Sequence, residues 1–147
     1  MLKIDIKKFE DLTPKELYAI LRLRSEVFVV EQNCVYQDLD DKDVLALHVI
    51  GFKKNTVVAY TRVFKPGDYF SEASIGRVVV KANERQYGYG REIMAASIKA
   101  VENLFHTTTI HLSAQCYLQK FYNSLGFEQI GEEYLEDGIP HIGMVKK

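Results

Sequence analysis

The sequence predicts an α+β fold in which helices flank a twisted, mixed and mostly antiparallel sheet of about six to seven strands. Three observations lead to this prediction. Short segments rich in β-branched and aromatic residues alternate with segments in which apolar residues recur at helical spacing. The connections are short, and no repeat or low-complexity linker interrupts them. The length of 147 residues and the hydrophobic share of 47% suit one domain over residues 1–147.

The chain is expected to begin with a strand and a helix. Residues 2–7 alternate apolar and polar side chains, as a strand at the edge of a sheet does. The sequence Thr13-Pro14-Lys15-Glu16 then forms a capping box with proline at the first helical position. An apolar face at helical spacing follows, made of Leu17, Ile20, Leu21, Leu23, Val27 and Phe28. These signals predict a helix that starts at Pro14.

The middle of the chain predicts an antiparallel meander. Residues 44–52 and 56–64 are rich in β-forming residues, and the polar residues 53–55 between them favour a hairpin turn. The apolar run at residues 75–81 predicts the next strand of the same meander.

The second half predicts two helices around a buried strand. Apolar residues at helical spacing predict the first helix, over residues 91–105. Residues 108–113 predict the strand, and residues 116–125 predict a helix that Gly126 closes.

A terminal hairpin is expected at the end of the sequence. Residues 127–131 and 139–146 have strand character and flank the turn sequence Asp137-Gly138. We expect this hairpin to lie beside the strand of residues 108–113.

The strongest functional signal lies between the strand at residues 75–81 and the helix at residues 91–105. It reads Arg85-Gln86-Tyr87-Gly88-Tyr89-Gly90. Two glycines two positions apart let successive backbone N–H groups turn toward one point, and the following helix adds unpaired donors and the positive end of its dipole. The segment therefore predicts a binding site for a phosphate-bearing cofactor, near which Arg91 adds positive charge.

Two common glycine loops do not fit this segment. The dinucleotide fingerprint needs a third glycine where this chain has Ile93. A P-loop ends in Gly-Lys-Ser/Thr, whereas Gly90 is followed by Arg91 and Glu92. The predicted meander also disfavours a nucleotide-binding sheet of parallel strands.

The segment resembles the pyrophosphate loop of the GNAT superfamily of acetyl-CoA-dependent N-acetyltransferases, Arg/Gln-x-x-Gly-x-Gly/Ala, through Arg85, Gly88 and Gly90. The sequence Phe121-Tyr122-Asn123-Ser124-Leu125-Gly126-Phe127 is similar to a second signature of that family, at the end of its late helix. The chain also resembles the ElaA-like branch of that family, at residues 28–33, 37–40, 75–78 and 136–144.

The resemblance implies a three-layer fold in which the two central strands, at residues 75–81 and 108–113, splay apart. The pantetheine arm of acetyl-CoA, the implied cosubstrate, would enter the gap and act partly as an added strand. This is physically reasonable because pantetheine carries two amides for the unpaired N–H and C=O groups of a parted strand. The implied cofactor-binding residues are Val78, Val79, Val80, Arg85, Gln86, Tyr87, Gly88, Tyr89, Gly90 and Arg91.

The implied activity is transfer of an acetyl group to a primary amine by direct attack on the thioester. The family pattern places the hydroxyl of Tyr122 near the cofactor sulfur as the general acid, and a phenol is mostly protonated at neutral pH. A backbone N–H near Val79 would meet the oxyanion. The alternative for Tyr122 is one more apolar position on its helix. The alternative function is a non-catalytic module that binds or senses an acyl-CoA.

The general base stays open between two leading candidates. Glu31 follows the first helix, where a carboxylate could bind the substrate ammonium or relay its proton, although an exposed glutamate is usually solvated. His48 lies in an apolar strand, where a hydrogen-bonded structural histidine is common. His111 and His141 carry the same ambiguity.

The acidic stretch at residues 38–43 fails the test for a calcium loop. Counted from Asp38, the sixth position is Asp43 instead of glycine and the twelfth is Val49 instead of glutamate. A solvated acidic loop is the first interpretation. The second is a wall of the acceptor pocket that attracts a cationic amine.

Charge and composition disfavour several classes of protein. The net charge is −1 from 19 basic and 20 acidic side chains without a block of like charges, so neither nucleic acid nor an anionic membrane is expected as a partner. The start of the chain lacks the apolar core of a signal peptide, which favours a cytoplasmic protein. Cys34 and Cys116 have no metal-type spacing, so we expect reduced thiols and no metal. The sequence leaves open a homodimer.

Overall fold

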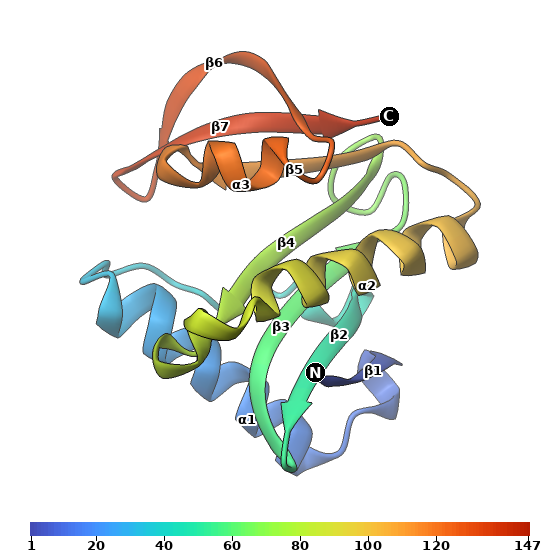
Figure 1. Ribbon diagram of the computed structural model, residues 1–147, viewed down its shortest axis with the longest axis vertical. Helices are drawn as coiled ribbons and strands as arrows, with labels where there is room; N and C mark the ends of the chain where they lie inside the picture. The colour runs from blue at the N-terminus through green and yellow to red at the C-terminus, as the bar shows by residue number, and fades with distance from the viewer.

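The computed structural model describes all of residues 1–147. Its seven strands form one sheet in the order β1-β2-β3-β4-β5-β7-β6 (Figure 1). The strands are β1 Lys3–Lys8, β2 Leu47–Lys53, β3 Thr56–Phe64, β4 Ala73–Val80, β5 Ile110–Gln115, β6 Glu128–Glu136 and β7 Ile139–Lys146. The helices are α1 Pro14–Arg24, the π-helix η2 Ser25–Glu31, α2 Tyr89–Phe105 and α3 Gln119–Asn123. Only β4 and β5 pair in parallel, which confirms the predicted mixed, mostly antiparallel sheet.

Helices cover both faces of this sheet. Successive residues of a strand point to opposite faces, and in β2 the side chain of Val49 packs in the same cluster as Ile93 of α2. Its neighbour Ile50 packs with Ile20 of α1. The molecule therefore has three layers, with α1 and α2 on opposite sides of the strands (Figure 1).

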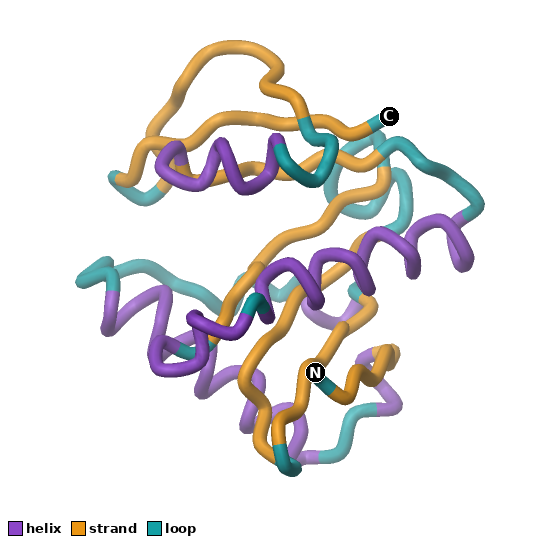
Figure 2. The backbone as a smooth tube through the Cα atoms, in the orientation of Figure 1, coloured by secondary structure: helices purple, strands orange, loops and turns teal.

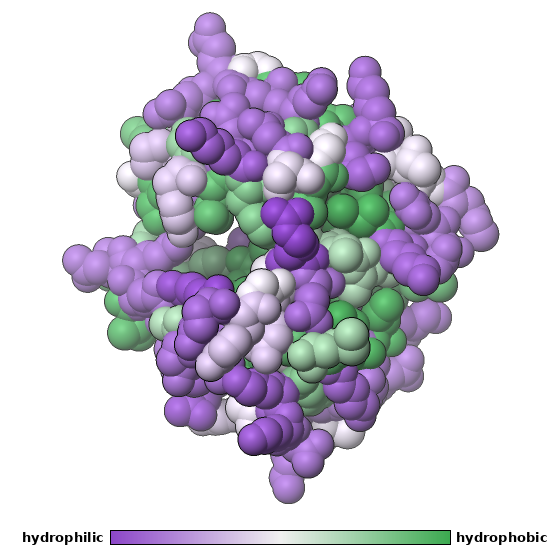
Figure 3. All heavy atoms as spheres, in the orientation of Figure 1, coloured by the Kyte–Doolittle hydropathy of each residue, from purple (hydrophilic) through white to green (hydrophobic).

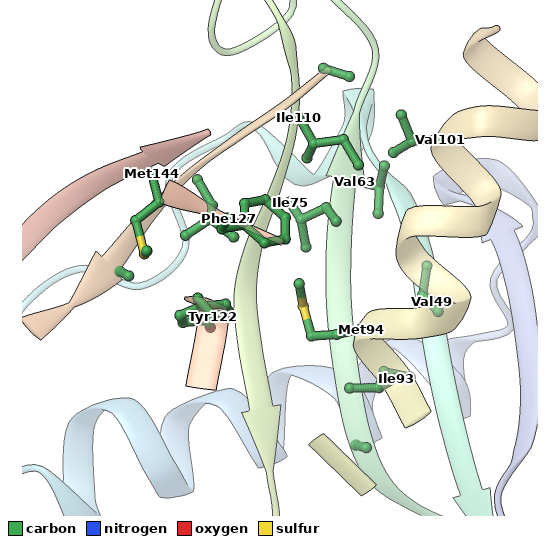
Figure 4. Close-up of a cluster of buried hydrophobic side chains, with 14 of the residues drawn as sticks. Val49, Val63, Ile75, Ile93, Met94, Val101, Ile110, Tyr122, Phe127 and Met144 are labelled. Carbon is green, nitrogen blue, oxygen red and sulfur yellow. The ribbon is translucent and has the colours of Figure 1, made fainter. Parts of the chain in front are cut away.

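The C-terminal part of the sheet shares its core with the N-terminal part. Tyr122 of α3 and Phe127 belong to the cluster that holds Met94 of α2 and Ile75 of β4. Figure 4 shows these side chains together around β4. The core thus fixes α3 on the same face of the sheet as α2.

The first helix begins as the sequence predicts. The Thr13 hydroxyl accepts a hydrogen bond from the N–H of Glu16 at 3.1 Å, and the Glu16 carboxylate accepts one from the N–H of Thr13 at 2.9 Å. After α1 the chain continues as the π-helix η2, a rare form that is frequent at functional sites.

Both predicted hairpin turns are confirmed. Lys54 and Asn55 between β2 and β3 have φ of 50° and 67°, and Asp137 and Gly138 between β6 and β7 have φ of 50° and 78°. Two successive residues with positive φ are typical of type I′ turns, which match the twist of the strands they join. The second turn brings β7 alongside β5, as expected.

The two central strands part soon after they meet. β4 and β5 pair only at Ala73 with Ile110 and at Ser74 with His111, near the start of each strand. Beyond these pairs β4 runs toward α1 while β5 stays with α3 and β7 (Figures 1 and 2). The predicted splay of the central strands is confirmed, and it leaves the β5-facing edge of β4 without a strand partner.

Three predicted elements have a boundary that is wrong by more than two residues. β2 starts at Leu47 instead of residue 44, because Asp43–Leu45 forms a 3-10 turn whose Asp43 carboxylate is held by buried arginines. The last helix is shorter than residues 116–125, with a 3-10 turn at Cys116–Leu118 before α3.

β6 runs on to Glu136 instead of ending at residue 131. It is exposed along its whole length and bows away from β7 (Figure 2), with a register shift between Ile130 and Tyr134. A strand with no buried face carries no apolar alternation, so its second half gives no sequence signal.

The acidic stretch at residues 38–43 is not the fully solvated loop that was expected, because two of its four aspartates are buried. Asp38 and Asp43 are buried and receive hydrogen bonds from Arg24, which is 0% exposed. Arg62 binds Asp40 at 2.6 Å and Asp43 at 3.0 Å. Guanidinium groups neutralise the carboxylates of Asp38, Asp40 and Asp43, so Asp41 is the one acidic side chain of the stretch that stays exposed without an ion pair. The role of the stretch in the structure is to fix the loop between η2 and β2.

Candidate functional site

Two cavities follow one another along the free edge of β4. The first has a volume of about 420 Å³, within the usual range for small-molecule sites. Its walls come from η2, the end of β4, the 3-10 helix η4 (Ala82–Tyr87) with the start of α2, and α3. The opening is visible at the left of Figure 3, between the upper and lower parts of the molecule. Of the predicted site residues, those that line this cavity are Glu31, Val78, Val79, Val80, Arg85, Gly88, Gly90, Arg91 and Tyr122.

The glycine loop has an open concave surface toward the first cavity. Gly88 is left-handed with φ of 75° at the start of α2, and a Cβ placed there would meet no atom within 4 Å. Backbone conformation and not space therefore requires glycine at this position. At Gly90 a Cβ would lie 3.6 Å from the ring of Phe121, inside the cavity wall. The first-turn N–H groups of α2, a helix of 17 residues, are free for an anion.

Each of the three guanidinium nitrogens of Arg85 donates a hydrogen bond to a protein oxygen. Its Nη1 and Nη2 donate to the two carboxylate oxygens of Glu31 at 2.6 and 2.8 Å, and its Nε donates to the carbonyl of Val80 at 3.1 Å. This contact ties the end of η2 to the loop. It also occupies the carboxylate of Glu31, which argues against the predicted role of Glu31 as the base.

Arg91 is the cation of the loop without a carboxylate partner. Its Nη2 donates to the hydroxyl of Ser124 at 3.0 Å, and its guanidinium lies 5.8 Å from the ring centre of Phe121. A guanidinium with free donors at a cavity wall suits a phosphate group.

The side chains of three predicted cofactor-binding residues do not line the first cavity. Gln86 is exposed and does not line the cavity. The ring of Tyr87 lies 4.3 Å from the ammonium of Lys53, and Tyr89 is 5% exposed in the main core. These residues could reach a ligand only through their backbone.

Tyr122 stands where the two cavities join. It is 5% exposed, and its ring packs edge-on against Phe121 and Phe127. Burial raises the pKa of its hydroxyl well above the usual value, so the phenol stays protonated at neutral pH. Val78, Gln115 and Tyr122 line both cavities.

A β-bulge lies in β4 at this junction. Tyr60 pairs with Val79 and Arg62 pairs with Gly76, so Arg77 and Val78 stand opposite the single residue Thr61. Arg77 has φ of 48°, in the left-handed region. Bulges re-aim backbone groups and are frequent next to active sites, so this one turns the edge of β4 where the two cavities meet.

The second cavity continues from Val78 toward the start of β4. Its other walls are β5, the loop after η2 and the β6–β7 hairpin, and its polar groups include Glu136, Asp137 and His141. Of these, sequence reasoning singled out only His141. The sequence analysis uses Asp137 only as a turn residue, and Glu136 only as part of the segment of residues 136–144 that carries the resemblance.

Sequence reasoning also missed an amide pair that bridges the cleft. The side chains of Gln32 at the end of η2 and Gln115 at the end of β5 donate to each other at 3.3 and 3.2 Å, and both residues line both cavities. A contact between residues 83 positions apart has no local sequence signal.

His48 lies outside both cavities. It is 0% exposed, and its two ring nitrogens pair with the hydroxyl of Tyr60 at 2.6 Å and the carbonyl of Asp43 at 2.9 Å. Burial lowers its pKa below the usual value. His48 is therefore a buried, fully hydrogen-bonded residue that lines neither cavity. His111 likewise lies outside the cavities, against Glu72 and the ring of Phe70.

Cys34 and Cys116 are free thiols. No group of three or more His, Cys, Asp or Glu side chains is arranged to hold a metal ion. No helix has both the length and the apolar character to span a membrane.

The sequence matches a family model over residues 9–147, and that family is described as the acetyltransferase (GNAT) domain. Protein ElaA of Escherichia coli (strain K12) is 42% identical over 139 residues, which cover 93% of this chain and 91% of that protein. The crystal structure of Escherichia coli ElaA has a TM-score of 0.93 at 39% identity and covers 100% of both chains.

Two further solved structures have the same fold. An acyl-CoA N-acyltransferase from Pseudomonas aeruginosa has a TM-score of 0.93 at 42% identity, over 99% of this chain and 100% of that one. An aminoglycoside 6′-N-acetyltransferase complexed with coenzyme A has a TM-score of 0.73 over 97% of this chain and 96% of that one. At 17% identity the latter shows only a shared fold.

Proposed function

This chain belongs to the GNAT acetyltransferase family, in the branch of ElaA, and on this premise we propose that it transfers the acetyl group of acetyl-CoA to a primary amine. One observation carries the proposal. A cavity that suits an acyl-CoA and a second, polar cavity share a wall at Tyr122. A transferase needs two adjoining binding sites of this kind, with the reacting atoms at their junction.

The residues of the first cavity fit an acyl-CoA. The open backbone at Gly88, the first turn of α2 and Arg91, which has no carboxylate partner, would hold the pyrophosphate. The free edge of β4 at Val78, Val79 and Val80 would pair with the pantetheine amides. The transferase would form one domain over residues 1–147. It would lie in the cytoplasm, since acyl-CoA thioesters are made and used inside cells.

The thioester supplies an activated acyl group, and the chain supplies a proton and donors. The buried Tyr122 hydroxyl would donate its proton to the departing sulfur as the general acid. Backbone N–H groups at the bulge of β4, near Val79, would stabilise the oxyanion. The amine acceptor would enter through the second cavity.

The test is release of free thiol from acetyl-CoA in the presence of a panel of amines, with CoA binding measured by calorimetry. We expect wild-type turnover that depends on the amine and falls at least about 100-fold in Tyr122→Phe, while the affinity for CoA is kept. CoA binding without turnover on any amine would instead favour a non-catalytic acyl-CoA sensor. Absence of CoA binding would refute both functions.

A further inference from the structure

The second cavity holds one imidazole whose tautomer is fixed by the backbone. His141 is 7% exposed at the start of β7, and its Nδ1 lies 2.7 Å from the carbonyl oxygen of Ile139. A carbonyl oxygen only accepts hydrogen bonds, so Nδ1 must carry the hydrogen. In the neutral ring the lone pair then lies on Nε2. His141 thus has one defined basic atom.

A carboxylate faces that atom. Oε2 of Glu136 lies 3.5 Å from Nε2 of His141, and the ring of His141 stacks on Tyr134 at a centroid distance of 6.2 Å. The backbone carbonyl, the ring of Tyr134 and the carboxylate together hold the orientation of the imidazole. A carboxylate next to an imidazole stabilises the imidazolium that forms when the ring accepts a proton.

The other charged and titratable groups around this cavity are mostly engaged. Arg77 of β4 pairs with Asp38, and the hydroxyl of Tyr36 donates to Asp38 at 2.8 Å. The thiol of Cys34 contacts the backbone carbonyl of Asp137 at 3.4 Å.

Three more titratable side chains belong to the same surroundings. The hydroxyl of Tyr134 bonds Ser113, and Tyr122 is the proposed acid. The carboxylate of Asp137 is exposed at the turn. In general, a carboxylate is a weaker base than a neutral imidazole. His141 is therefore the best-placed base in the second cavity.

We propose that His141 is the general base, and that its Nε2 accepts a proton from the acceptor ammonium in the second cavity while Glu136 stabilises the resulting imidazolium. This inference rests on the transferase function proposed above. The neutral amine then attacks the thioester carbon, so that an N–C bond forms and the C–S bond breaks. Tyr122 protonates the sulfur, and the proton shed by the amide nitrogen restores Tyr122. His141 passes its proton to water, so each cycle releases one proton.

The test compares His141→Asn with a matched control. Asparagine keeps a donor for the Ile139 carbonyl but has no basic atom in place of Nε2. His111→Asn is the control, since His111 also pairs with a glutamate, Glu72 at 3.2 Å, but lies outside both cavities. Transfer from acetyl-CoA to the best amine of the panel is measured for each protein between pH 5.5 and 9, together with CoA affinity and thermal stability.

We expect His141→Asn to lower kcat/KM at neutral pH by about 100-fold or more, while the affinity for CoA is unchanged. The acid limb of the wild-type pH profile should disappear, and His111→Asn should keep that limb. Added imidazole should restore part of the rate in His141→Ala, which a merely structural role would not allow. If His141→Asn is unstable, Glu136→Gln takes its place, with an expected loss of about tenfold and CoA affinity kept.

Two outcomes would overturn the assignment, and they can be told apart. If the wild type transfers acetyl groups and stable His141→Asn keeps both its rate and its pH profile, His141 is not the base and the transferase function stands. If the wild type binds CoA but transfers to no amine, the transferase function fails and the role of His141 fails with it.

Discussion

Glu31 accepts two hydrogen bonds from the guanidinium of Arg85, at 2.6 and 2.8 Å, across the mouth of the first cavity. Glu31 ends the π-helix η2 and Arg85 belongs to the 3-10 helix η4, Ala82–Tyr87, before α2, so the pair connects two elements through residues 54 positions apart. An acyl-CoA that enters here meets a guanidinium whose charge is already balanced. The pair therefore lowers the net charge that the cavity presents to an acyl-CoA, and it leaves no free carboxylate at Glu31 for proton transfer.

Replacement of Glu31 tests this assignment. Because Glu31→Gln removes a negative charge beside the expected phosphate site, we expect CoA to bind about two- to fivefold more tightly at low salt. The value of kcat should change by less than about threefold, whereas loss of a general base costs about 100-fold or more. Calorimetry and steady-state rates measure the two effects. A collapse of kcat with intact CoA binding would make Glu31 the base after all.

Arg91 should contribute more to CoA binding than any other side chain of the loop. Since its guanidinium has no carboxylate partner, Arg91→Gln removes a charge-assisted contact, and we expect the Kd for CoA to rise about 10-fold. The dependence of log Kd on log salt should also become shallower. Arg22→Gln is the control, because Arg22 is an exposed arginine of α1 outside the first cavity. Equal effects of the two variants would exclude a specific phosphate contact.

Alanine substitutions at Gly88 and Gly90 should affect different properties of the protein. Gly88 has a positive φ and open space, so Gly88→Ala should destabilise the protein by about 1 kcal/mol through backbone strain. Gly90 has no such φ, and a methyl group there would lie between Phe121 and Val80. We expect Gly90→Ala to keep its thermal stability and to weaken CoA binding. Thermal unfolding measures the stability of both variants, and calorimetry measures their affinity for CoA. A stable Gly88→Ala with weak CoA binding, beside an unstable Gly90→Ala, would contradict the assigned roles.

The sequence predicts much of the fold because its signals are local. The capping box at Thr13, the left-handed turn residues and the glycine loop each act within a few residues, and the structure has them where they were expected. Long-range partners decide the rest. From the sequence alone Glu31 is a plausible base, but in the structure its carboxylate is bound by Arg85. His48 is also plausible from the sequence, but Tyr60 and Asp43 occupy its two ring nitrogens. Likewise, Gln32 and Gln115 meet only because β4 and β5 part.

Asp40 and Asp43 should make the stability of the protein depend on pH in the acid range. Burial alone would raise the pKa of Asp43, but hydrogen bonds from Arg24 and Arg62 outweigh it and hold the pKa below the ordinary 3.8. Asp40 is shifted in the same direction, since the hydrogen bond and charge of Arg62 outweigh its burial. A folded-state pKa below the unfolded one gives stability that is complete above about pH 4 and is lost as pH falls further. We therefore expect the Tm to fall steeply below about pH 4.

A matched pair of variants assigns that dependence to the network. In the wild type, Arg24 and Arg62 both contact the carboxylate of Asp43. Asp43→Asn removes that negative charge, so we expect the free energy of unfolding to fall by about 3–5 kcal/mol at neutral pH. Its Tm should also fall less steeply below about pH 4, because one of the titrating carboxylates is gone. Asp41→Asn is the control, since Asp41 is exposed in the same loop and has no ion pair. If Asp41→Asn costs as much as Asp43→Asn, burial of the network does not explain the stability of this loop.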